Sequence, residues 1–350
     1  MATASDLLTV RLKSPDKGAK RDRSSPNIQL ASKDSKERED TRRKEFFDSG
    51  FDRWYELVKD KTIPSQVVEI KPAEAKAIIF CWKRDFQNKE GDGTVLSEAN
   101  IQLPADLHDL VDRVSLTIGP GKGAFVKLST RSPKDSPLAF EKAHRTYLAS
   151  LSSLGENPSV NDKLNLLSTI VGESLKVTTG EEAVRMLISS DRVGEDLEYA
   201  LEKGDEEFMK VIHLVVREWV NVPQWAEFRG FVYGGQLNAL GQYNYLVRFP
   251  VLEDKVSRIK ADLEKFHASI QERITMDRYI IDFVWTEDNM YLIEFNAFSE
   301  ERMFSTTTGL WDWENPADRE QMMKGPLTLR IRGQDAALSL ITPKWRDIVM

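Results

Sequence analysis

The chain has 350 residues, of which 41% are hydrophobic and 30% are charged, and its net charge is −7. This length is sufficient for one large domain or for two lobes around one site. The only cysteine, Cys81, excludes an intramolecular disulfide, and no run of about 18 apolar residues predicts a membrane span. The amino-terminal residues lack the apolar core of a secretory signal. The sequence therefore predicts a soluble, cytoplasmic protein.

The first 45 residues are rich in Ser, Lys, Asp and Arg and carry more basic than acidic side chains. Because this composition cannot build a core, residues 1–45 are expected to form a disordered basic tail. A basic arm that touches phosphate is the alternative. The rest of the chain is acidic, which is not the charge pattern of a nucleic-acid-binding body.

Apolar spacing predicts the elements of the first half of the chain in order. Aromatic and aliphatic residues at helical intervals predict a helix from Phe46 to Val58. Pro104 marks the start of a later helix, and Gly119 ends it. Thr178 and Glu181 have the spacing of a capping box. The other expected elements are strands over 65–70 and 75–82 and a polar loop over 150–164.

The second half of the chain contains a β-branched run over 211–219 and two hairpins separated by a long amphipathic helix. The expected ranges are 226–243 and 277–297 for the hairpins and 252–272 for the helix. Strands and long helices followed by hairpins predict an α+β architecture with two lobes. We expect a body over 46–349, with a first lobe over about 46–210 and a hinge and second lobe over about 211–349.

The second hairpin carries the most informative polar residues. If Trp285 pairs with Tyr291, Asp282 lies directly opposite Glu294, and Asn296 follows two residues later on the same face. Like charges at opposed positions repel, so a cation should lie between them. Two carboxylates and an amide oxygen are ligands that suit Mg²⁺.

The alternative is that both carboxylates face water. The same face is also expected to carry Ile280, Val284 and Leu292, which is unusual for a solvated surface. If the two carboxylates repel in the metal-free chain, neutralising either should leave the fold intact or slightly more stable.

The first hairpin turns at Gly234-Gly235. Pairing of the residues that flank this turn puts Glu227 opposite Gln242 and places Arg229 on the same face as Glu227. Two roles for Arg229 remain open. It either pairs with Glu227 on the sheet or clamps a phosphoryl oxygen beside the metal.

Further upstream, residues 125–129 alternate as a strand with Lys127 among apolar neighbours. A lysine in such a place is often a rim residue whose ammonium reaches water. The turn that follows contains Ser132 and Lys134, which favour an anion.

These segments resemble the cell division cycle protein 123 family, an ATP-grasp branch known as ATP-dependent assembly chaperones for eukaryotic translation initiation factor 2. The resemblance spans about residues 46–349 and rests on short motifs in the same order. The motifs are FDRWYELVKDKTIPS (51–65), FVKLSTRSPKD (125–135), LISSDRV (187–193), VVREW (215–219), AEFRGFVYGGQLNALGQY (226–243), DFVWTEDNMYLIEFNAFSE (282–300) and ITPKWRD (341–347).

The resemblance implies an ATP-grasp fold that holds Mg²⁺-ATP between two lobes, and it assigns residues to parts of that ligand. Arg229 would face the triphosphate. The phosphate contacts of the first lobe would be Lys127, Ser132, Lys134 and Asp135. The hinge that holds adenine through its backbone would be Val215, Val216, Arg217, Glu218 and Trp219. The Mg²⁺ ligands would be Asp282, Glu294 and Asn296.

The sequence departs from the family pattern at Thr130, where a tryptophan is usual, and at Ile188, where a lysine is usual. Glu294-Phe-Asn-Ala-Phe298 replaces Asp-Phe-Asn-Pro-Phe and is closer to the Glu-x-Asn of ATP-grasp ligases. The acidic linker and acidic carboxyl tail common in the chaperones are also absent. These departures leave the expected ATP-binding residues in place.

Two classes of function fit these residues. The first is an ATP-dependent chaperone whose partner is a translation initiation factor 2 subunit. The second is an ATP-grasp ligase or phosphotransferase that activates an acceptor carboxylate or phosphate. In the second class Lys127 and Arg229 would be catalytic, and an RNA end is one acceptor that the basic tail could contact.

Overall fold

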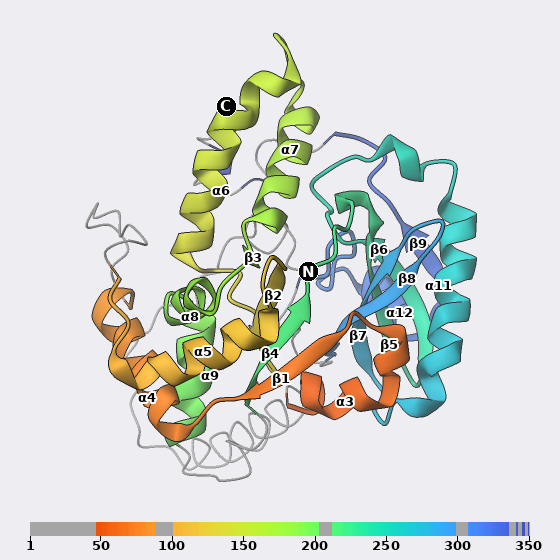
Figure 1. Ribbon diagram of the computed structural model, residues 1–350. Helices are drawn as coiled ribbons and strands as arrows, with labels where there is room; N and C mark the ends of the chain where they lie inside the picture. Colours follow the sequence, from red (N-terminus) through yellow and green to blue (C-terminus); the bar gives the residue numbers. More distant parts are fainter. Residues whose placement is uncertain are drawn as a thin grey trace, which may run out of the picture.

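The structure is a computed structural model that describes residues 47–87, 101–202, 212–298 and 307–335, together with Ile341, Trp345, Arg346 and Val349. The expected tail, residues 1–45, lies outside the described residues. The described strands form two sheets, one of four strands and one of five (Figure 1).

The four-stranded sheet has the order β1-β4-β2-β3, and its strands are antiparallel. Helices α4, α5, α8 and α9 lie beside this sheet and share an apolar core with it (Figure 1). The strands are β1 (Ser65–Glu69), β2 (Ala124–Leu128), β3 (Lys176–Val177) and β4 (His213–Glu218). The helices are α4 (Pro72–Asp85), α5 (His108–Ile118), α8 (Gly180–Ile188) and α9 (Asp191–Glu202).

The five-stranded sheet has the order β8-β7-β5-β6-β9, and only the β6–β9 pair is parallel. Helix α11 (Val256–Ile270) packs its apolar stripe on this sheet, and α12 (Pro316–Lys324) contacts β5 and β6. The strands are β5 (Glu227–Tyr233), β6 (Gln236–Gln242), β7 (Tyr279–Trp285), β8 (Met290–Ala297) and β9 (Thr328–Arg330).

One apolar core connects the two halves of the described chain. It includes residues of α3 (Phe51–Val58), α6 (Pro137–Ser150) and α7 (Val160–Glu173) as well as strands β5 to β8. Trp54 of α3 meets Phe295 of β8 edge to face, with ring centroids 5.3 Å apart. The short 3₁₀ turns are Lys59–Lys61, Ala105–Leu107, Leu151–Leu154, Gln224–Ala226, Pro250–Leu252 and Gln271–Arg273.

Three expectations about elements in the first half are wrong. Residues 75–82 are part of helix α4, because Pro72 occupies its first turn and Glu74 accepts a hydrogen bond from the Lys71 N–H at 2.7 Å. The polar segment over 150–164 already contains the start of α7 at Val160. The N-cap of α8 is Thr179, one residue later than the expected capping box.

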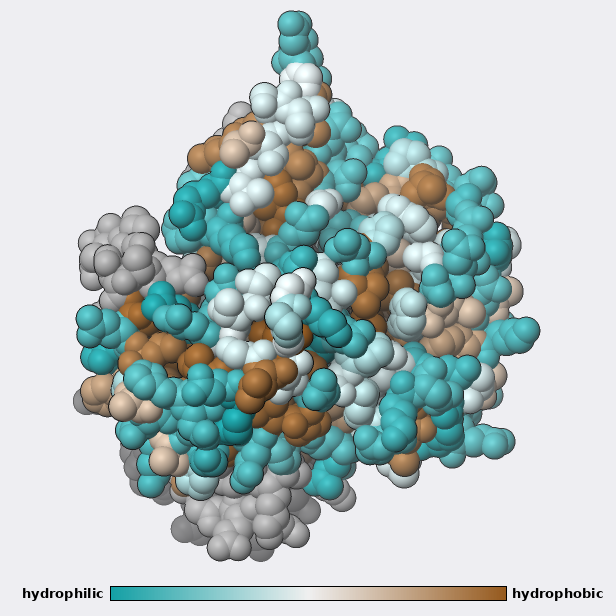
Figure 2. Space-filling model, viewed as in Figure 1, coloured by the Kyte–Doolittle hydropathy of each residue, from teal (hydrophilic) through white to brown (hydrophobic). Residues whose placement is uncertain are grey.

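The surface of the first half contains apolar side chains between polar ones. Figure 2 shows hydrophobic residues over the region where α4, α5 and β1 lie in Figure 1. The exposed large hydrophobic side chains of these elements are Phe80, Leu116 and Val67. None of the helices in the described ranges is both long and apolar enough to cross a membrane.

Candidate functional site

The β7–β8 hairpin brings the expected carboxylates together. Asp282 lies directly opposite Glu294, as expected, although the turn pairs Trp285 with Met290 and not with Tyr291. The register shifts by one residue between Asp282 and Phe283, which makes Ile293 an extra residue on β8. The β-bulge therefore restores the expected pairing of the two carboxylates.

The same bulge changes which apolar side chains accompany the carboxylates. Leu292 pairs with Phe283 and packs in the large core, so its expected place on the carboxylate face is wrong. Ile293 packs with Val284 on the other side of the sheet. Because side chains alternate along a strand, one inserted residue exchanges the faces of all residues between the bulge and the turn.

Arg229 pairs with Asp282. Its Nε donates to Asp282 Oδ1 at 2.8 Å and a terminal nitrogen donates to Oδ2 at 2.7 Å. Strand β5 lies next to β7 and places the two residues directly opposite each other. Both side chains are buried, with 4% and 2% of their surface exposed. The arrangement is a bidentate ion pair, which fixes both the distance and the plane of the guanidinium.

The expected placement of Glu227 opposite Gln242 is wrong, and neither of the two roles left open for Arg229 named its ion-pair partner, Asp282. The turn at Gly234-Gly235 forms as expected, with positive φ at both glycines and Tyr233 paired with Gln236. A bulge between Phe231 and Val232 then shifts the register, so that Phe228, and not Glu227, lies opposite Gln242. Sequence alone could not supply the partner of Arg229, since it belongs to the other hairpin.

Lys127 crosses from the four-stranded sheet to Glu294. Its Nζ lies 2.8 Å from Glu294 Oε2, and both side chains are largely buried. Burial lowers the pKa of Lys127, and Glu294 opposes this shift only in part. Burial raises the pKa of Glu294, but Lys127 and Lys134 outweigh it and hold that pKa well below its usual range. Glu294 is therefore a carboxylate at neutral pH.

Lys134 and Tyr243 complete the charged cluster around Arg229. The Arg229 guanidinium lies 4.4 Å from the centroid of the Tyr243 ring, and Lys134 Nζ lies 5.7 Å from it. Lys134 Nζ also lies 3.5 Å from the Tyr243 hydroxyl. Tyr243 is not among the site residues expected from the sequence, although it is the last residue of the motif that contains Arg229. Tyr243 links the turn after β2 to the second sheet through cation–π contacts.

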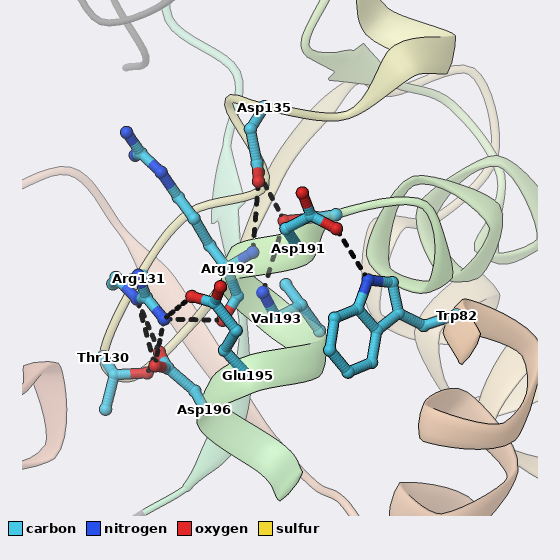
Figure 3. Close-up of polar contacts among 10 residues, drawn as sticks. Trp82, Thr130, Arg131, Asp135, Asp191, Arg192, Val193, Glu195 and Asp196 are labelled. Carbon is cyan, nitrogen blue, oxygen red and sulfur yellow. Dashed lines mark hydrogen bonds and ion pairs between the residues drawn. The ribbon is translucent and has the colours of Figure 1, made fainter. Parts of the chain in front are cut away.

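The turn after β2 is fixed to α9, as Figure 3 shows. Asp135 accepts hydrogen bonds from Ser190 Oγ at 2.5 Å and from the Arg192 N–H at 3.1 Å, so its carboxylate caps the start of α9. Thr130 donates to Asp196 at 2.6 Å, and Arg131 forms an ion pair with the same carboxylate. In this arrangement Asp135 shapes the turn, and its expected contact with phosphate stays a prediction.

Ser132 is buried with 5% exposure in the same turn, and its expected role also stays a prediction. The last residue of β4 and the residue after it use their main-chain N–H groups within the protein. Glu218 donates to Pro64 O at 2.9 Å and Trp219 donates to Gly123 O at 3.1 Å. Adenine contacts at the hinge would therefore use carbonyl groups or main chain beyond Trp219.

The other expected hinge side chains point in different directions. Val215 belongs to the core between the sheets and Val216 to the core under the helices. Arg217 is buried and donates to Ile293 O at 2.9 Å and to Ser65 Oγ at 3.2 Å. Burial lowers the pKa of Arg217 to about 10. Arg217 thus contacts the bulge residue of β8, which sequence analysis did not predict.

The expected ligands offer the oxygen atoms that a magnesium ion prefers. Asp282 and Glu294 are opposed, and Asn296 Nδ2 lies 3.5 Å from Asp282 Oδ2, so the three expected ligands lie together. In the described residues no three His, Cys, Asp or Glu side chains are grouped to hold a metal. A magnesium ion here would need phosphate or water to complete its six oxygen ligands.

Comparison with known proteins places this chain in a family. A model of the D123 family matches residues 167–339, a stretch that includes Arg217, Arg229, Asp282 and Glu294. The chain belongs to the D123 family. The resemblance expected from the sequence is therefore confirmed, and Lys127 lies outside the matched stretch.

Two relatives of this D123 chain carry names that describe a role or a family. A Dictyostelium discoideum protein, translation initiation factor eIF2 assembly protein, is 29% identical over 50% of this chain and 47% of that protein. Cell division cycle protein 123 of Yarrowia lipolytica is 25% identical over 75% of this chain and 65% of that protein. The chain thus spans about half to two thirds of the length of these relatives.

The solved structure of Cdc123 from Schizosaccharomyces pombe resembles this D123 chain in fold. The TM-score is 0.54 with 20% sequence identity, and the match covers 83% of this chain and 98% of that chain. This likeness shows that the chain shares the fold of that Cdc123 structure, and the described helices and sheets confirm the α+β class expected from the sequence. It concerns the fold alone.

Proposed function

We propose that this D123 chain binds Mg²⁺-ATP at the charged cluster between its two sheets. The observation that carries the proposal is a buried group of charges in which basic residues predominate. Burial of charges is unfavourable unless opposite charges accompany them. The cluster consists of Lys127, Lys134, Arg217, Arg229, Asp282 and Glu294, and Glu227 is buried two residues before Arg229.

Each residue of the cluster has a place in this proposal. Lys127 and Lys134 from the first half and Arg229 from the second would neutralise the triphosphate. Asp282, Glu294 and Asn296 would hold the metal. A bound Mg²⁺ would supply positive charge next to the phosphates and orient them. Because these side chains are shielded from water, each charge interaction is stronger there than at the surface.

We further propose that the bound nucleotide serves an assembly role on translation initiation factor 2. Support comes from family membership and from relatives named as eIF2 assembly proteins. The partner would be a subunit of that factor. Since the chain spans 47% of the Dictyostelium relative, this role is argued from the shared part only.

The test is calorimetric titration of the purified chain with ATP in the presence of Mg²⁺. We expect binding by wild type, and loss of most of that affinity in Lys127→Met. Arg330→Met is the control, because Arg330 of β9 also forms an ion pair, with Asp318 of α12, in which both terminal nitrogens lie 2.7 Å from the carboxylate oxygens, outside the charged cluster. No binding by wild type, or equal loss in the control, would overturn the proposed site.

The second part of the test decides between chaperone and enzyme. ADP, AMP and phosphate are measured with and without a translation initiation factor 2 subunit, and separately with RNA. Nucleotide-dependent binding of the subunit without steady turnover supports the assembly role. Steady turnover that appears only with an acceptor would select the ligase or phosphotransferase.

A further inference from the structure

The two expected metal-binding carboxylates are both occupied by the expected phosphate-binding cations. Both oxygens of Asp282 accept hydrogen bonds from Arg229, at 2.8 and 2.7 Å. Glu294 Oε2 accepts from Lys127 Nζ at 2.8 Å. The pairs use different elements, since Arg229 is on the neighbouring strand β5 and Lys127 is on β2 of the other sheet. Two sets of ligand-binding groups thus neutralise each other.

The Asn296 side chain is also oriented to suit the ion pairs and not a metal ion. Its amide nitrogen, and not its oxygen, faces Asp282, with Nδ2 3.5 Å from Oδ2. A metal ion would need the amide oxygen instead. All three expected ligands would therefore have to change partner or orientation before they could hold the ion.

Binding of either ligand alone would break these pairs without replacing them. A metal ion that took Asp282 would leave the buried Arg229 without its carboxylate and next to a new positive charge. A triphosphate that took Lys127 and Arg229 would leave Glu294 and Asp282 as unpaired carboxylates beside phosphate. Removing one partner from a buried pair is strongly unfavourable, whereas an exchange of partners is not.

We propose that metal and nucleotide enter this site only as a pair, in an exchange of ion-pair partners. Arg229 leaves Asp282 and Lys127 leaves Glu294, and both cations then pair with the phosphates. The two carboxylates bind the metal at the same time. This inference rests on the proposed binding of Mg²⁺-ATP. It adds that the chain opposes binding of free nucleotide and of free metal.

The surroundings of Arg229 support a short movement. The guanidinium donates to Thr307 O at 2.6 Å and lies over the Tyr243 ring at 4.4 Å. Neither contact involves Asp282, so each can hold Arg229 while its carboxylate partner changes. Lys134, which also contacts Tyr243, lies near enough to influence the charges of both Asp282 and Glu294.

The first measurement uses the full wild-type chain in three calorimetric titrations. They are ATP with Mg²⁺, ATP with EDTA, and Mg²⁺ without nucleotide. We expect ATP affinity to fall by roughly 10- to 100-fold without the metal, the range of typical couplings between sites. By reciprocity, the affinity of the chain for Mg²⁺ should be lower by the same factor when no nucleotide is bound. Equal ATP affinity with EDTA and with Mg²⁺ would overturn the exchange while leaving ATP binding in place.

The second measurement looks for a gain of metal binding. Mn²⁺ is titrated without nucleotide into wild type, Arg229→Met, Lys127→Met and the control Arg330→Met, with bound Mn²⁺ measured by electron paramagnetic resonance. Arg229→Met and Lys127→Met free a carboxylate, so we expect each to bind Mn²⁺ more tightly than wild type, and Arg330→Met to match wild type. Folded variants without any gain would overturn the inference.

The outcomes separate this inference from the proposed function. Absence of ATP binding with Mg²⁺ overturns the proposed function and the exchange with it. ATP binding that does not depend on the metal overturns the exchange alone. If circular dichroism shows that neither methionine variant folds, the three wild-type titrations still decide the question.

Discussion

Asp282 is held in a buried ion pair, and this pairing reverses an expectation about its replacement. Repulsion from Glu294 suggested that Asp282→Asn would leave the fold intact or more stable. In the structure Arg229 neutralises Asp282, and Lys127 neutralises Glu294. The dominant effect of the substitution is therefore loss of a charge partner, and not relief of repulsion.

We expect Asp282→Asn to lower the free energy of unfolding by on the order of 3 kcal/mol, because it leaves the Arg229 guanidinium buried without its carboxylate. The measurement is urea unfolding of the ligand-free chain followed by fluorescence. The matched double variant, Arg229→Met with Asp282→Asn, removes both charges and should recover part of the loss. Equal stability of Asp282→Asn and wild type would mean that the pair contributes nothing in solution.

At this scale the sequence predicted that Asp282 lies opposite Glu294, but it did not predict the cations that pair with them. Opposition of Asp282 and Glu294 follows from the hairpin pattern, even though the turn pairing was one residue off and the bulge at Ile293 compensated for it. The contact of Arg229 with Asp282 depends on which strands become neighbours. That information is not local, because the two residues lie in separate hairpins.

Among the elements, β8 is fixed at its bulge by groups from outside its own sheet. Thr62 donates to Leu292 O at 2.7 Å, and Arg217 donates to the carbonyl of the extra residue, Ile293, at 2.9 Å. Glu294 is the next residue. The first sheet therefore contributes to the position of a carboxylate on the second sheet.

Arg217→Met tests this contribution. Methionine keeps much of the buried volume but cannot donate to Ile293 O, so we expect faster amide hydrogen exchange along β8 and weaker Mg²⁺-ATP binding. Burial already disfavours the Arg217 charge, as its lowered pKa of about 10 indicates, so the global free energy of unfolding should change by less than about 1.5 kcal/mol.

The control for Arg217→Met is Arg330→Met, which removes an arginine from β9 of the same sheet as β8. It should leave exchange along β8 as in wild type. Unchanged exchange in Arg217→Met would show that the bulge holds its register without this contact. A global loss of stability with uniform exchange would assign Arg217 to packing alone.

The elements also show where periodicity failed. The apolar run over 75–82 gave no decisive period, and Pro72 with Glu74 was the signal that a helix begins there. The motifs at 125–135 and 187–193 are far apart in the sequence, whereas the structure joins them through a hydrogen bond between Ser190 and Asp135. This contact forms because α9 packs against the turn after β2, and such packing cannot be predicted from the spacing of residues along the chain.

At the scale of the whole molecule, one apolar core includes residues from both sides of residue 210, where the sequence suggested a boundary between two lobes. One apolar cluster includes Val215 of the first sheet and Phe283 of the second. The candidate site lies across the same boundary, since Lys127 reaches Glu294. The expected division near residue 210 stays a prediction, and movements of one sheet against the other would disturb a shared core.

A buried histidine beside this shared core makes the stability of the fold depend on pH. His267 of α11 lies 2.8 Å from the Tyr279 hydroxyl of β7, measured from its Nε2. Burial lowers the pKa of His267 to about 4, against about 6.5 in an unfolded chain. The folded state therefore binds a proton more weakly than the unfolded state, so stability is present above pH 6.5 and is lost as the pH falls toward 4.

We expect this histidine to lower the free energy of unfolding by on the order of 3 kcal/mol between pH 6.5 and pH 4, because its pKa falls from about 6.5 to about 4 on folding. Carboxylates also titrate in this window, so the measurement is a difference. Urea unfolding is followed across the window for wild type and for the double variant His267→Phe with Tyr279→Phe, which removes both polar groups. The double variant should lose less stability on acidification, whereas a control at the exposed His108, His108→Gln, should follow wild type. Parallel curves for wild type and the double variant would show that His267 has the same pKa in the folded and unfolded chain, and that its burial between α11 and β7 does not disfavour the proton.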